Sequence, residues 1–72
     1  IYPNPSGDVI NLRAQEDITG VQIYNMSGKL ITTLTTFGQP NQTIDISDFI
    51  DGMYILRIET EENVYTEKFV KR

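Results

Sequence analysis

The chain has 72 residues and a net charge of −4, and it contains neither cysteine nor histidine. These counts exclude disulfide bonds and a zinc site built from Cys and His ligands. The acidic balance also argues against nucleic acid as a partner, because neutralising phosphates needs a basic face. A domain of this size leaves only about 3–5 kcal/mol of net stability, which must come from strand pairing and apolar packing.

No apolar run approaches the length of a membrane span, and the first residues are not those of a signal peptide. The length allows one domain. We therefore expect a single domain over residues 1–72, cut from a longer protein.

Six short runs either alternate apolar and polar residues or are rich in β-branched residues, patterns that are typical of strands. In chain order these runs are 9–14, 18–24, 29–36, 42–46, 53–60 and 64–70. Their spacing is that of a β-sandwich or barrel. Parallel strands would need crossover helices, for which the chain has no room. The sequence therefore predicts an all-β, antiparallel domain.

The segments between these runs carry turn residues. We expect an extended or turned segment at 1–8, a polar break at 15–17, a tight turn at 25–28, a loop at 37–41, a compact corner at 47–52 and a hairpin turn at 61–63. The corner has room for one helical turn capped by Ser47 or Asp48. Gly52, at its end, is expected to have a positive φ, which would make a β-branched residue destabilising there.

The side chains needed for catalysis are largely missing. Without His or Cys, only hydroxyls and carboxylates are left, and Ser6, Ser27 and Ser47 all fall in predicted turns, where they serve turn and cap chemistry. No phosphate-cradling glycine loop is present. The sequence therefore predicts a protein that is not an enzyme and uses no cofactor.

Two sets of side chains invite a binding interpretation. Asp45, Asp48 and Asp51 have a spacing at which carboxylates can hold Ca²⁺, but the pattern is not that of an EF-hand, and a capped corner explains it equally well. We expect no metal site. The four tyrosines could form a sugar-binding platform if they shared an exposed face, but filling the core and rim of a small sandwich is the favoured role. These tyrosines are Tyr2, Tyr24, Tyr54 and Tyr65.

Four sequence blocks occur in an order that is diagnostic when taken together. They are YPNPS at 2–6, VQIYNMSGKLI at 21–31, IDIS at 44–47 followed by Phe49 and GMYILRI at 52–58, and KFVK at 68–71. Over essentially the whole chain they resemble the type A C-terminal sorting domain of the type IX, or Por, secretion system.

The resemblance implies an immunoglobulin-like antiparallel β-sandwich of about six to seven short strands. It implies a domain that directs a fused N-terminal cargo from the periplasm across the outer membrane of a Gram-negative bacterium, through an outer-membrane translocon. A surface sortase would then remove the domain and attach the cargo to lipopolysaccharide, so that the cargo ends at the cell surface or is secreted. The sorting-motif residues carried over are Pro3, Asn4, Pro5, Gly28, Gly52, Tyr54, Lys68, Phe69, Val70 and Lys71.

The sequence of residues 53–72 predicts a terminal hairpin with a basic end. We expect the export machinery to read this hairpin, partly by pairing with an exposed edge strand. Dimerisation through an edge strand is left open, as are two other functions: a carbohydrate-binding accessory module and a structural spacer. Tyr54 and Ile58 are expected in the core, where truncation to Ala would cost about 2–5 kcal/mol.

Overall fold

The structure, a computed structural model, describes residues 2–6 and 8–72, and for residues 2–6, 36 and 37 it describes the backbone alone. The described residues form five strands: β1 (Tyr2–Ser6), β2 (Val9–Asn25), β3 (Leu30–Asp45), β4 (Gly52–Thr60) and β5 (Val64–Lys71). Every pairing between them is antiparallel. The prediction of an all-β, antiparallel chain is confirmed. No helix long and apolar enough to span a bilayer occurs in the described part.

The number of strands is lower than the predicted six to seven, because two pairs of predicted strands merge, while the segment expected to be extended or turned at 1–8 contributes β1. β2 runs through the predicted polar break at 15–17, where its pairing with β3 shifts register between Arg13 and Ile18. Such an irregularity bends a strand without ending it. β3 runs through the predicted loop at 37–41. Among the described strands β3 pairs only with β2, and an edge strand tolerates Pro40 and a positive φ of 72° at Gly38.

The corner at 47–52 differs from the prediction in its detail. It contains turns and bends rather than a helical turn, and the Phe49 amide donates to the Ile46 carbonyl at 3.0 Å. The capping side chain is Asp45, whose Oδ1 accepts a hydrogen bond from the Ser47 amide at 2.8 Å. Asp45 lies at the end of a strand, so its carboxylate satisfies a turn amide directly and no helix is needed.

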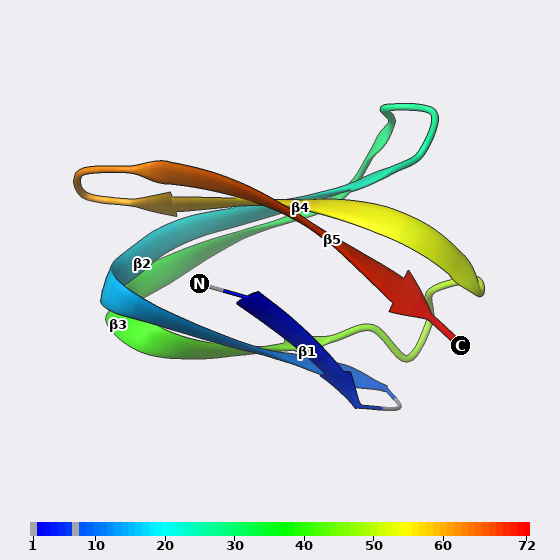
Figure 1. The fold of residues 1–72 in the computed structure, drawn as a ribbon, viewed down its shortest axis with the longest axis horizontal. Coiled ribbons are helices and arrows are strands. Elements are labelled where there is room, and N and C mark those ends of the chain that lie inside the picture. The colour runs from blue at the N-terminus through cyan, green and yellow to red at the C-terminus, as the bar shows by residue number, and fades with distance from the viewer. Residues whose placement is uncertain (1, 7) are drawn as a thin grey trace.

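The long strand β2 organises the sheet. β3 pairs with β2 along nearly its whole length, whereas β1 pairs with residues 9–13 of β2 and β4 with residues 18–25. β1 and β4 therefore share the other edge of β2, and β5 continues the sheet beyond β4. Figure 1 shows the result: β2 and β3 bend sharply, so that β1 lies below while β4 and β5 lie above.

The bend encloses a single hydrophobic core. Inward residues alternate along each strand with outward ones, as the period of two requires, and the core takes side chains from both halves of β2. Its members are Ile10, Leu12, Ile18, Val21, Ile23, Ile44, Ile46, Tyr54, Leu56, Ile58 and Phe69. Tyr54 and Ile58 lie in the core, as the sequence predicts.

Candidate functional site

The terminal hairpin of β4 and β5 is regular along its whole length. Its register runs from Gly52 opposite Lys71 to Glu59 opposite Val64 without a shift. The predicted turn at 61–63 is closed by the Thr60 amide, which donates to the Asn63 carbonyl at 2.9 Å, and by the Asn63 amide, which donates to Thr60 Oγ1 at 3.0 Å. The hairpin predicted over 53–72 is therefore present, and it begins one residue earlier.

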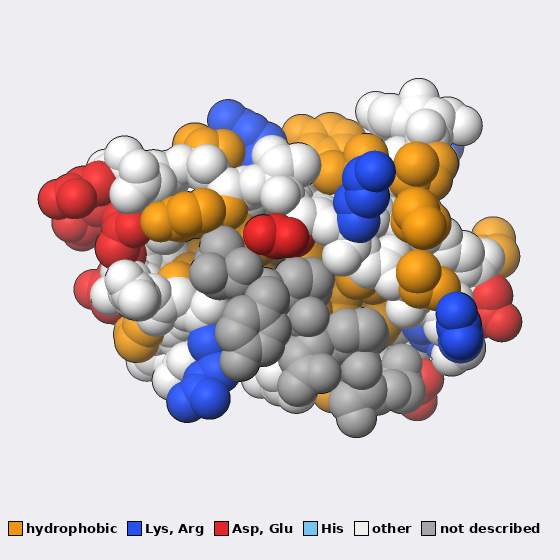
Figure 2. Space-filling model, viewed as in Figure 1, with side chains coloured by type: hydrophobic (Ala, Val, Ile, Leu, Met, Phe, Trp, Pro, Cys, Tyr) orange, Lys and Arg blue, Asp and Glu red, His pale blue; other side chains and the backbone are white. Residues whose placement is uncertain are grey.

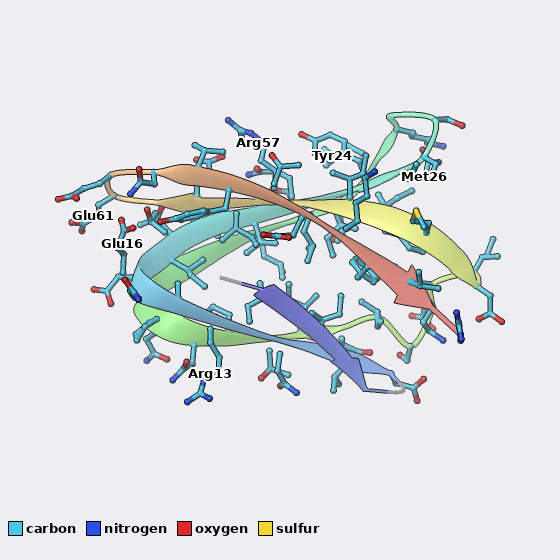
Figure 3. The ribbon with its side chains drawn as sticks, in the orientation of Figure 1. Arg13, Glu16, Tyr24, Met26, Arg57 and Glu61 are labelled. Carbon is cyan, nitrogen blue, oxygen red and sulfur yellow. The ribbon has the colours of Figure 1, made fainter. Side chains whose placement is uncertain are left out.

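The turn of this hairpin is tied to the bend of β2 by Glu16. Its carboxylate accepts hydrogen bonds from the Tyr65 hydroxyl at 2.7 Å, from Asn63 Nδ2 at 2.9 Å and from Thr60 Oγ1 at 2.8 Å. The hydrogen bond from Tyr65, followed by those from Asn63 and Thr60, holds the pKa of Glu16 below its ordinary value. The same contact raises the pKa of Tyr65. Figure 3 shows Glu16 beneath the hairpin turn that carries Glu61.

The sequence gives no sign of this contact. Glu16 lies in a segment predicted to be a polar break, and its three donors are 44, 47 and 49 residues away along the chain. A carboxylate between two strands is most simply explained as solvated. Only the bend of β2 brings it to the hairpin turn.

The opposite end of the hairpin is held by aromatic packing. The ring of Tyr54 stacks on Phe69, its cross-strand neighbour, with centroids 5.3 Å apart, and meets Phe49 from the corner at 5.1 Å. Both Tyr54 and Phe69 are buried. The Tyr54 hydroxyl donates to the carbonyl oxygen of Ile50, so its polar end is satisfied within the corner. Packing of this kind fixes the direction of the chain end relative to the core.

Lys71 makes the last attachment. It is 8% exposed, and its Nζ lies 3.8 Å from Asp51 Oδ1 and 4.0 Å from Asp8 Oδ1. The two carboxylates come from the corner and from the turn between β1 and β2. Because both are largely exposed to solvent, the charge interaction contributes little free energy. The interaction instead positions the chain end, because one lysine contacts two separate turns.

Three sorting-motif residues lie elsewhere. Pro3, Asn4 and Pro5 belong to β1, opposite Leu12, Asn11 and Ile10 of β2. β1 and β5 come close to each other where the two halves of the sheet meet, and Figure 1 shows them running in similar directions. The structure thus brings the opening motif near the terminal strand, which the sequence alone did not predict.

The two glycines of the motif have backbone roles. Gly28 has a φ of 85° in the turn between β2 and β3, where its amide donates to the Asn25 carbonyl at 3.0 Å. The Asn25 side chain completes this turn by accepting from the Ser27 and Lys29 amides. Gly52 has a φ of 154° at the start of β4, which confirms the expected positive φ. Side chains are strained in both conformations.

The remaining motif residues, Lys68 and Val70, face outward on β5, on either side of the buried Phe69. Lys68 lies opposite Ile55, and Val70 lies opposite Met53. Neither contributes to the core, so the closing motif alternates between residues that hold the hairpin and residues that are presented to solvent. Figure 2 shows hydrophobic side chains gathered on the right of the view, over the β4 and β5 end, beside basic ones.

Neither alternative binding site is assembled by the described side chains, among which Tyr2 is not included. The described residues contain no group of three carboxylate, His or Cys side chains that could hold a metal ion. Hydrogen bonds from Ser47 lower the pKa of Asp45, and Asp51 faces Lys71, so these carboxylates have other contacts. Of the tyrosines, Tyr54 is in the core, as the favoured interpretation predicts, and Tyr65 contacts Glu16. The described tyrosines therefore form no common exposed platform.

Comparison with known proteins gives one match. Residues 1–72 match the model of a family described as the secretion system C-terminal sorting domain. No curated protein and no solved structure matches the chain. The match covers every residue of the sequence and agrees with the ordered motif blocks at 2–6, 21–31, 44–58 and 68–71. The chain therefore belongs to the C-terminal sorting domains of the type IX, or Por, secretion system, which are non-catalytic signal domains.

Proposed function

We propose that the terminal hairpin, residues 52–72, is the part of this sorting domain that the export machinery reads, and that the rest of the sheet holds it in shape. One observation carries the proposal. The hairpin is attached to the body at its turn by Glu16, at its other end by the contacts of Tyr54 with Phe49 and Ile50 of the corner, and at the chain end by Lys71. Among the described strands, however, β5 pairs only with β4.

An edge strand of this kind offers a row of backbone donors and acceptors to a partner. Adding a strand to such an edge is a common way of recognising another chain, since main-chain hydrogen bonds give affinity and alternate side chains give specificity. The outward side chains of β5 would supply that specificity. The motif residues Lys68 and Val70 are among them.

The wider pathway follows from the family and is part of the same proposal. The domain directs an N-terminal cargo from the periplasm through an outer-membrane translocon, and a surface sortase then removes the domain and attaches the cargo to the cell surface. The motif residues in β1, together with Gly28 and Gly52, stabilise the fold of the sorting domain. We also propose that the bent sheet is an immunoglobulin-like sandwich. The half of β2 that pairs with β1 and the half that pairs with β4 both contribute side chains to the same core, as the two layers of a sandwich would.

The test is an export assay. Residues 1–72 are fused behind a periplasm-directed fluorescent protein in a bacterium that has the type IX machinery, and the fluorescence outside the cell is measured. We expect export of the fusion, and loss of export when Lys68–Arg72 are deleted. A fusion that stays in the periplasm would contradict the sorting role. Normal export of the deletion would contradict the role of the terminal hairpin.

The deletion also removes Phe69 from the core, so a control for stability is needed. Ile44→Ala removes a buried side chain from β3, leaves the hairpin sequence unchanged, and is expected to destabilise the domain by about 2–5 kcal/mol. If Ile44→Ala is exported while a deletion of similar stability is not, the loss is due to the missing chain end. Equal loss of export in both would mean that the machinery responds only to stability.

A further inference from the structure

The outward face of the upper sheet carries an apolar row that crosses three strands. Register places Leu30 of β3 opposite Tyr24 of β2, Tyr24 opposite Ile55 of β4, and Ile55 opposite Lys68 of β5. Residues directly opposite one another point to the same face of a sheet. Because Ile23, Leu56 and Phe69 are buried, their chain neighbours in this row point outward. Figure 3 shows the Tyr24 side chain on the outer side of the sheet.

The next pair of residues widens the row. Met53 lies opposite Val70, and these side chains are 44% and 36% exposed, while Leu30 is 47% exposed. With Val70 of β5 included, the row extends over four strands, and at a strand spacing of about 4.8 Å it is about 14 Å long. We call Tyr24, Leu30, Met53, Ile55 and Val70 the outer apolar row. A contiguous exposed apolar surface in a soluble domain marks an interaction site more often than chance.

The row has a definite boundary on one side. The adjacent cross-strand row contains Gln22 and Arg57, and Arg57 Nη1 donates to Gln22 Oε1 at 3.1 Å. Arg57 also forms an ion pair with Glu59 at 2.7 Å, so its charge is already compensated. The apolar surface therefore ends where a polar, internally paired surface begins. A polar rim around an apolar centre is the usual anatomy of a protein interface.

The charges at the ends of the row indicate the kind of partner. Lys68 lies at one end, and Lys29 is the chain neighbour of Leu30 at the other. Within the described part of the chain, neither lysine has a carboxylate within 4.0 Å of its ammonium group. If a second copy of the domain packed against the row, its lysines would lie next to the lysines of the first copy in both the parallel and the antiparallel orientation. A domain of net charge −4 has no overall electrostatic attraction to an anionic membrane.

We propose that the outer apolar row is the docking surface for a protein component of the export machinery, whose own face is apolar in the middle and carries carboxylates at its ends. The proposal rests on the proposed function and adds a second contact to it. The edge of β5 is recognised through its backbone, and the outer apolar row is recognised through its side chains. Met53, Ile55 and Val70 of the row lie on the same hairpin as the β5 edge, so one partner can cover both surfaces together.

The test uses the fusion described above, with variants that change only exposed side chains. Met53→Ser and Lys68→Glu are expected to reduce export, whereas Lys68→Arg keeps it. Loss of an important contact residue in a protein interface weakens binding by about 10-fold or more. The matched control is Ile50→Ser, which removes a more exposed apolar side chain, 82% exposed, outside the row and outside the hairpin. Thermal melting of each isolated domain shows that it is folded.

The outcomes separate the two proposals. Export of Met53→Ser and Lys68→Glu at the level of Ile50→Ser would overturn the docking surface and leave the sorting role intact. No export of the unchanged fusion would overturn both. Light scattering of the isolated domain is expected to give a monomer, and vesicles of phosphatidylethanolamine and phosphatidylglycerol are expected not to bind it. A dimer, or vesicle binding, that Met53→Ser abolishes would overturn the choice of a machinery protein as the partner.

Discussion

The most informative single position for stability is Tyr54, because its ring and its hydroxyl make separate contacts. The ring stacks on Phe69 and meets Phe49, whereas the hydroxyl donates to the Ile50 carbonyl. Tyr54→Phe keeps the ring and removes the hydrogen bond, which is expected to cost about 0.5–1.5 kcal/mol. Tyr54→Ala also removes the ring from a site that is 7% exposed, and is expected to cost about 3–5 kcal/mol.

These magnitudes are large for a domain of this size. With about 3–5 kcal/mol of total stability, Tyr54→Ala should leave a substantial unfolded population at 25 °C. Tyr54→Phe should remain folded with a melting temperature lower by about 4–8 °C for each kcal/mol lost. Urea unfolding followed by circular dichroism measures both variants, and Tyr24→Phe is the control, since Tyr24 lies on the outer face. Equal losses for Tyr54→Phe and Tyr54→Ala would refute the argument that ring packing dominates.

Three further predictions concern the attachments of the hairpin. Gly52→Val should destabilise the domain by more than about 1 kcal/mol, because a φ of 154° is strained for a β-branched residue; an unchanged urea midpoint would contradict this. Glu16 has a lowered pKa, so its carboxylate contributes stability above the ordinary value of 4.5, and this stability is lost as pH falls through the folded pKa. The difference in melting temperature between wild type and Glu16→Gln should therefore shrink from pH 7 toward pH 3, and a constant difference would show that ionisation is not involved. Lys71→Met should cost less than Lys71→Ala in urea unfolding, because the buried stem of Lys71 packs while its partners are solvated; the reverse order would mean that the charge dominates.

Alternation along the predicted strand 53–60 was sufficient to predict that Tyr54 and Ile58 are inside. Both side chains are in the core. Period-two alternation is a local property, and it survives whatever the strands pair with. The turn at Asn25–Gly28 and the terminal hairpin were predicted for the same reason, because their chemistry lies within a few residues.

Strand boundaries were predicted less well. The polar break at 15–17 and the Gly-Pro loop at 37–41 have the composition of loops, yet both lie inside long strands. A register irregularity in β2 and the edge position of β3 allow both strands to continue through these segments, and neither property is visible in a local window.

By itself the sequence determined the class of fold, the inward faces of the strands and, through its ordered motif blocks, the family. These depend on local pattern and on the order of residues along the chain. The tertiary structure alone decided that Glu16 ties down the hairpin turn, that Lys71 joins two turns, and that Leu30, Tyr24 and Ile55 lie in one outward-facing row. Each of these contacts joins residues separated in the chain. They exist only because β2 bends and sets the register of its neighbours, which no local pattern of the sequence specifies.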